Sequence, residues 1–86
     1  MKQPTTYEMR TKRTIKAIAK YMRDEVRRIY PQCAGQPDEE IKIRAYDRTR
    51  NGQKYVLFTA QTFYKLADGY HSASWDAIIN KSLILK

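Results

Sequence analysis

The chain has 86 residues, of which 42% are hydrophobic and 12% aromatic, which suits one small domain with a modest core. Its net charge is +8 and its pI about 9.8, so the expected partner is a polyanion, either nucleic acid or an acidic surface. The one cysteine excludes an internal disulfide, and no segment has the apolar length of a signal peptide or a membrane span. We therefore expect a soluble cytoplasmic protein that does not bind membranes.

The opening segment carries basic residues but has no periodic apolar face. We expect residues 1–10 to form a flexible basic arm, because a helix there would have no face to bury. The capping-box spacing of Thr5 and Glu8 leaves an earlier helix start as the alternative. Residues 11–86 are then a single α+β domain.

A strong helical pattern follows the arm. The apolar residues recur at i, i+3, i+7, i+11 and i+14, which predicts a long amphipathic helix from about residue 11 to the residue before Pro31. They are Ile15, Ile18, Met22, Val26 and Ile29. The segment 31–37, which contains two prolines and a glycine, is predicted to be a loop.

Beside the apolar stripe the same helix places a line of cations, here named the helix cation row: Lys16, Lys20, Arg23 and Arg27, flanked by Arg13. The row covers about 16 Å of helix axis. An ordinary solvated helix surface mixes charges of both signs, with acids placed four residues from bases. Because the helix's acids fall outside the row, we expect it to face the phosphates of a nucleic acid or the carboxylates of a partner.

Residues 40–60 alternate between apolar and polar side chains on both sides of Asn51-Gly52, the preferred pair for a type I′ turn. This predicts a β-hairpin in which Ala45 lies opposite Phe58 and Tyr46 opposite Leu57. The apolar face is expected to pack against the helix.

The opposite face of this hairpin presents Arg44, Tyr46, Arg48 and Tyr55. Guanidinium groups beside flat rings suit nucleic acid, since cations meet phosphates and rings stack on bases. The same residues are also ordinary exposed cross-strand pairs, and a partner protein or a second copy of the chain is a further occupant of this face. The oligomeric state stays open, with a dimer as one option.

Residues 60–68 fit either a short helix or a third strand. After them, Ser72 or Ser74 is a suitable helix N-cap, and Trp75 begins a run with helical spacing. The predicted fold is α+β: a long N-terminal amphipathic helix and a C-terminal helix packed on one face of a small antiparallel hairpin sheet of two or three strands. This helix–hairpin–helix order resembles double-stranded-RNA-binding and integrase-arm modules, although the motif residues of those families are absent.

No motif for catalysis is present, and one histidine, His71, with one cysteine, Cys33, cannot make a Cys/His metal set within one chain. We therefore expect no enzyme activity, no metal and no cofactor. The leading hypothesis is a small nucleic-acid-binding protein, DNA or RNA, that uses the helix cation row and the Arg/Tyr sheet face. The alternative is an inhibitor or adaptor of the phage or mobile-element type. It would dock on an acidic or nucleoprotein surface of another protein, for example a host defence complex.

Overall fold

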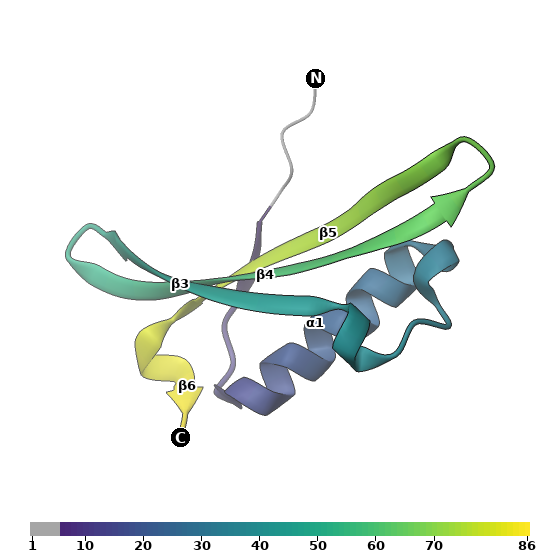
Figure 1. Cartoon of the computed structure of the whole chain (residues 1–86). Helices are drawn as coiled ribbons and strands as arrows, with labels where there is room; N and C mark the ends of the chain where they lie inside the picture. The colour runs from purple at the N-terminus through teal and green to yellow at the C-terminus, as the bar shows by residue number, and fades with distance from the viewer. Residues whose placement is uncertain (1–5) are drawn as a thin grey trace.

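The computed structural model describes residues 6–86, which fold as one helix against a mixed four-stranded sheet (Figure 1). The strand order is β1-β5-β4-β3; β1 runs parallel to β5, and the other neighbours are antiparallel. A two-stranded parallel pair, β2 with β6, joins the start of the helix to the end of the chain. The elements are β1 (Tyr7–Met9), β2 (Arg13–Thr14), α1 (Ile15–Ile29), β3 (Lys42–Arg50), β4 (Gln53–Leu66), β5 (Gly69–Asn80) and β6 (Ile84–Leu85).

Helix α1 forms where the sequence predicts a helix, but it begins at Ile15 and not near residue 11, because Arg13 and Thr14 pair with β6 as the short strand β2. Arg13, predicted to flank the helix cation row, therefore lies outside the helix. Its N-cap is Thr14, whose hydroxyl oxygen accepts a hydrogen bond from the Ala17 backbone N–H at 3.1 Å. The helix ends at Ile29, two residues before Pro31. Ile18, Met22 and Val26 are fully buried, so the middle of the predicted apolar stripe packs on the sheet, whereas its two ends, Ile15 and Ile29, are 59% and 41% exposed.

The predicted hairpin and its register are confirmed. Asn51 and Gly52 both adopt positive φ, 51° and 78°, as a type I′ turn requires. Ala45 pairs with Phe58 and Tyr46 with Leu57. Phe58 is consequently buried under α1, whereas Tyr46 lies on the other side of the sheet.

The predicted fold is wrong in its second half. Residues 53–66 form one strand, β4, and the expected C-terminal helix is instead β5, a twelve-residue strand paired with β4 along its whole length. Ala73, Ala77 and Ile79 are buried on the helix side at a period of two, which outweighs the helical spacing seen from Trp75 onward. The helix–hairpin–helix order is therefore absent from the described residues, and the resemblance based on it no longer holds.

Part of the expected arm belongs to the sheet. Tyr7–Met9 form β1, and Met9 is buried against Ile79, its register partner on β5. Residues 1–5 lie outside the described residues, so the division into an arm and a domain stays a prediction.

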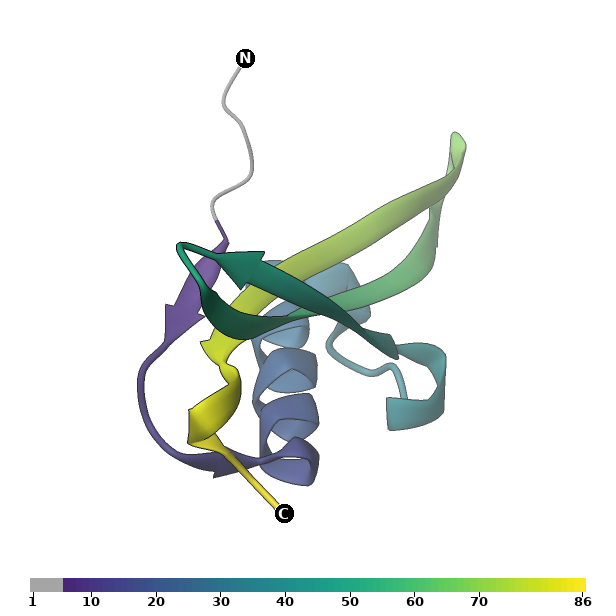
Figure 2. The same ribbon diagram turned by 90° about the vertical axis from the view of Figure 1, so that its left-hand side faces the viewer.

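The core lies between α1 and one face of the sheet (Figure 2). Its buried residues come from α1, from all four main strands or their ends, and from the loop after the helix. They are Met9, Ile18, Met22, Val26, Cys33, Ile41, Val56, Phe58, Ala60, Ala73, Ala77 and Ile79. An aromatic cluster of Tyr7, Tyr21 and Trp75, with ring centroids 5.6–6.0 Å apart, closes the side next to β1. Since α1 covers one face and is the one α-helix of residues 6–86, no helix of this part of the chain covers the other face of the sheet.

Candidate nucleic-acid interface

The sheet face opposite α1, here named the outer face, gathers the predicted site residues of the hairpin. Strand alternation and the register place Arg44, Tyr46 and Arg48 of β3 and Tyr55 of β4 on this face together. The neighbouring β5 adds Ile78 beside Leu57 and Asn80 beside Tyr55. The Arg/Tyr sheet face predicted from sequence therefore exists as one surface.

Cations line the outer face along the edge strand β3. We name Lys42, Arg44, Arg48 and Arg50 the β3 cation row. All four side chains are exposed, and none forms an ion pair with a carboxylate of the described residues. The row spans about 26 Å at the rise of a β-strand. These charges are therefore available to an external anion.

Two tyrosine rings support the guanidinium groups of this row. The Arg48 guanidinium lies 5.6 Å from the ring centroid of Tyr46, and the Arg50 guanidinium lies 5.5 Å from that of Tyr55. Tyr55 is itself held by a 3.0 Å hydrogen bond from its hydroxyl to Gln53 Oε1. Arg48 donates one hydrogen bond, from Nη1 to the Asp47 carbonyl oxygen at 3.0 Å, and its other N–H donors stay available for phosphate oxygens.

The outer face is hollowed between the β3–β4 turn and β1. An open hollow of about 410 Å³ has Leu57, Ile78 and Tyr55 along its sheet side. Arg48 and Arg50 lie on one flank, and Glu8 and Thr6 on the other. A mostly apolar floor beside guanidinium groups suits a flat, partly polar group such as a nucleobase.

The helix cation row has a different environment. Arg27 donates to the carbonyl oxygen of Gln36 at 2.8 and 3.1 Å, to Asp38 at 2.6 Å and to Asp24 at 3.3 Å. Only 22% of its side chain is exposed. Gln36 in turn accepts a hydrogen bond from the Thr62 hydroxyl at 2.6 Å and donates to the Phe63 carbonyl oxygen at 2.7 Å. Arg27 thus links the helix, the following loop and β4.

The other members of this row are only partly engaged by the fold. Arg23 donates to the Ile41 carbonyl oxygen at 3.1 Å, and Lys20 pairs with Asp24 at 2.9 Å. Arg13 is half-buried, with its guanidinium 4.8 Å from the Tyr21 ring centroid. Lys16 has no ion pair within residues 6–86. Because α1 lies across the sheet from the outer face, the two predicted cation surfaces do not form one interface.

Arg27 also alters the acid–base properties of the loop. Its hydrogen bond, together with the positive charges around it, lowers the pKa of Asp38. A second pair on the helix, Arg28 with Glu25 at 2.6 Å, lowers the pKa of Glu25 in the same way. Of the two helix acids, Asp24 pairs with Lys20 and Arg27 of the row, whereas Glu25 pairs with Arg28 outside it.

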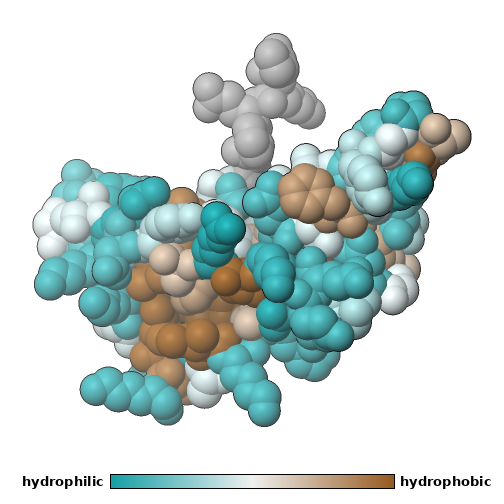
Figure 3. Space-filling model, viewed as in Figure 1, coloured by the Kyte–Doolittle hydropathy of each residue, from teal (hydrophilic) through white to brown (hydrophobic). Residues whose placement is uncertain are grey.

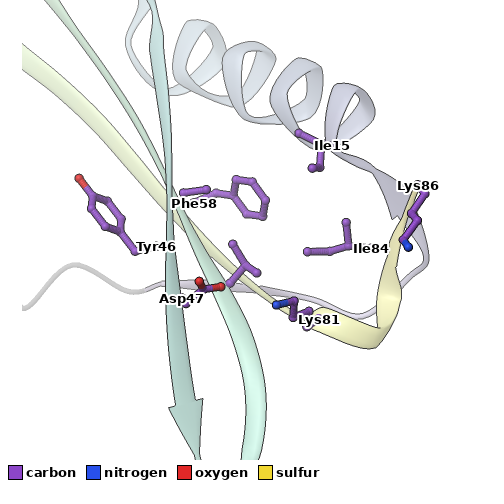
Figure 4. Close-up of a pocket in the computed structure, with 9 residues that line it drawn as sticks. Ile15, Tyr46, Asp47, Phe58, Lys81, Ile84 and Lys86 are labelled. Carbon is purple, nitrogen blue, oxygen red and sulfur yellow. The ribbon is translucent and has the colours of Figure 1, made fainter.

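A second concavity, here named the apolar hollow, lies on the helix side of the sheet (Figure 4). It measures about 420 Å³ and is lined by Ile15, Ala45, Val56, Phe58 and Ile84, with Lys81, Lys86, Asp47 and Tyr46 at its edge. In Figure 4 the Phe58 ring points toward the hollow and the Tyr46 ring points away from it. The brown surface in Figure 3 shows the same region as a hydrophobic patch surrounded by hydrophilic side chains.

Cys33 and His71, the two side chains of types most often used in catalysis or metal binding, are buried in the core or bonded to neighbouring side chains. Cys33 is buried in the core, which raises the pKa of its thiol. His71 Nε2 lies at hydrogen-bond distance, 2.7 Å, from Asp68 Oδ1, and the His71 ring stacks on the Tyr64 ring. Within residues 6–86, no group of three or more His, Cys, Asp or Glu side chains is arranged to hold a metal ion. The one α-helix of this part of the chain is too short and too polar to cross a membrane.

Sequence reasoning missed three residues at the far end of the outer face: Phe63, Lys65 and Tyr70. The register places all three on the same face as Arg44, and Phe63 and Tyr70 are 59% and 75% exposed. From the sequence, residues 60–68 fit either a helix or a strand, and only the strand assignment places these side chains on the outer face. In the structure, exposed positions alternate with buried or half-buried ones from Gln61 to Lys65.

Comparison of the chain with protein-family models, with curated proteins and with solved structures finds no match. The function is therefore argued from the surface itself.

Proposed function

We propose that the protein is a small nucleic-acid-binding domain that holds the phosphate backbone along the β3 cation row. The observation that carries this proposal is the row itself: four exposed cations, without an ion pair among residues 6–86, at alternate or near-alternate positions of one edge strand, beside exposed Tyr46 and half-buried Tyr55. The helix cation row contributes less, because Arg23 and Arg27 are held by backbone carbonyl groups and by Asp38.

Binding of phosphates along a row of cations predicts an affinity that depends strongly on salt concentration. Each phosphate neutralised by Lys or Arg releases condensed counterions, so affinity falls steeply with salt. The row also has a purely structural explanation, because cations on an exposed edge strand prevent it from pairing with strands of other molecules. The two explanations differ in whether binding to a polyanion depends on these particular residues.

The test uses two variants that each remove three positive charges. The sheet variant is Arg44→Gln/Arg48→Gln/Arg50→Gln. Its matched control is Lys12→Gln/Lys16→Gln/Lys20→Gln, three exposed lysines on the first turns of α1 and on the segment just before it. Fluorescence anisotropy at 20 to 300 mM salt would compare them with the wild type on duplex DNA, duplex RNA and single strands. We expect the sheet variant to lose about 100-fold in affinity and about two units of salt slope, and the control to lose less than about 10-fold. Equal losses in both variants would show that only net charge matters, and no binding at low salt would overturn the proposal.

A second candidate function is docking on an acidic or nucleoprotein surface of another protein. The apolar hollow favours it, because Ile15 is 59% exposed at its edge and Lys81 and Lys86 flank it. This arrangement suits an apolar anchor side chain between carboxylates. A complex recovered from cell lysate that survives nuclease treatment and is lost in an Ile15→Asp variant supports this candidate. Retention of that complex by the variant argues against it.

The cytoplasm remains the proposed location; the single cysteine supports it, since one cysteine cannot form an internal disulfide.

A further inference from the structure

The β4–β5 hairpin extends well past the end of the helix, as Figure 1 shows. Its tip carries exposed bulky apolar side chains: Phe63 is 59% exposed, Leu66 41% and Tyr70 75%. Exposed aromatic side chains do not improve the solubility of a small protein, so those at this tip indicate a contact with a ligand.

The two rings of this tip lie on the outer face. Lys65 pairs with Tyr70 across β4 and β5, and Phe63 pairs with Ser72, so Phe63 and Tyr70 are diagonal neighbours. The Lys65 ammonium lies 5.7 Å from the Tyr70 ring centroid. The tip therefore repeats the combination seen at the β3–β4 end, an aromatic ring with a cation beside it.

The inner face of the same tip is packed. Tyr64 stacks on His71 with ring centroids 5.6 Å apart and an interplanar angle of 18°, and Tyr30 lies 6.4 Å from Tyr64. Gln36 holds this end of β4 through Thr62 and the Phe63 carbonyl oxygen. The exposed rings are consequently presented from a supported strand pair.

We propose that Phe63 and Tyr70 stack on unpaired bases, so that the nucleic acid bound along the outer face is single-stranded. This inference rests on the proposed function, since the β3 cation row would hold the same strand. Phe63 has no polar atom and can meet a base only through its ring face. In a duplex the base faces are stacked on each other and only their edges are accessible, whereas a single strand offers them to aromatic side chains.

The bound strand then has a defined path. Tyr55 and Phe63 are eight residues apart on β4, about 26 Å along the strand. The outer face between them carries Leu57, Thr59 and Gln61 on β4. Thr59 has Asp76 of β5 on one side and Arg44 of β3 on the other, so the bound strand passes one carboxylate and would keep its phosphates on the β3 side. Contacts at both ends of this path require an oligonucleotide of several nucleotides, with phosphates near β3 and bases toward the hairpin tip.

The experiment separates stacking from phosphate binding. A 15-nucleotide single strand, the same strand in a duplex, and a 15-unit abasic strand are titrated with the wild type and with a Phe63→Ala/Tyr70→Ala variant. A Tyr70→Phe variant, which keeps the ring, is the matched control, and thermal melting checks that each variant is folded.

We expect the double variant to lose about 30-fold or more in affinity for the single strand, with an unchanged salt slope and unchanged duplex binding. The Tyr70→Phe variant should stay within about twofold of the wild type, and the abasic strand should bind the wild type at least as weakly as the intact strand binds the double variant.

Two results overturn the inference while the proposed function stands: equal affinity of the double variant and the wild type for the single strand, or the same loss on duplex and single strand. Absence of binding to every probe at low salt instead overturns the proposed function, and the inference with it.

Discussion

The protein has two rows of cations, one on a helix and one on a strand, that look equivalent in charge but differ in their surroundings. On α1, Arg27 has 22% of its side chain exposed and is bonded to Gln36 and two carboxylates. On β3, Arg44 and Arg50 are exposed and have no carboxylate partner among residues 6–86. A guanidinium already bonded to the fold must lose those bonds before it binds a phosphate, so available donors matter more than charge density.

The largest effect that we expect is a loss of stability when a cation of the helix row is removed. An Arg27→Ala variant removes the bonds to Gln36, Asp38 and Asp24, and we expect it to lower the free energy of unfolding by about 2 kcal/mol and Tm by about 10 °C. Nucleic-acid affinity, measured well below Tm, should stay within about threefold of the wild type. Thermal denaturation and anisotropy on the same preparation measure both quantities.

The matched control is Arg28→Ala, one residue away, which removes only an exposed pair with Glu25. It should cost less than about 0.5 kcal/mol. If Arg27→Ala were as harmless as Arg28→Ala but abolished binding, the assignment of the helix cation row to the fold would be wrong.

A smaller effect is expected from a substitution in the turn that positions the end of the β3 cation row. Gly52 has a φ of 78°, where a Cβ is strained, so we expect Gly52→Ala to cost about 1 kcal/mol of stability. It should also weaken binding by a few-fold, because Arg50 lies directly before the turn. Chemical denaturation with a Gly35→Ala control checks this, since Gly35 has ordinary φ and open space for a Cβ. Equal stability of the two variants would contradict the turn geometry.

The smallest effect is the pH dependence of the Arg27–Asp38 contact. Because Arg27 lowers the pKa of Asp38 in the folded state, this contact stabilises the protein above the ordinary carboxyl pKa and is lost as pH falls through the lowered value. An Asp38→Asn variant should therefore be less stable than the wild type near neutral pH and equally stable at about pH 2. Unfolding curves from pH 2 to 7 measure the difference; a difference that persists at pH 2 would indicate another cause.

The sequence was a good guide to the parts of the fold that local chemistry decides. The helix follows from its apolar period, although its Thr14 cap was not predicted, and the hairpin register follows from Asn51-Gly52, because only a few residue pairs accept two positive φ values. The outer position of Arg44, Tyr46, Arg48 and Tyr55 follows from that register. Local signals therefore located one end of the candidate interface.

The rest depended on contacts between distant residues. Trp75, Ile78 and Ile79 have helical spacing, but Ala73, Ala77 and Ile79 are buried by pairing with β4, which a single-sequence pattern does not reveal. The same missed strand hid Phe63 and Tyr70. The bond from Arg27 to Asp38 joins residues eleven apart through a loop, so the helix cation row looked more available than it is.

The most direct test of the central claim follows individual arginine side chains by NMR. Nε–H resonances of Arg23, Arg27, Arg44, Arg48 and Arg50 are recorded while a 15-nucleotide single strand is added at low salt. The account predicts shifts for the three arginines of β3, with those of Arg23 and Arg27 nearly unchanged. Shifts confined to Arg23 and Arg27 would contradict it.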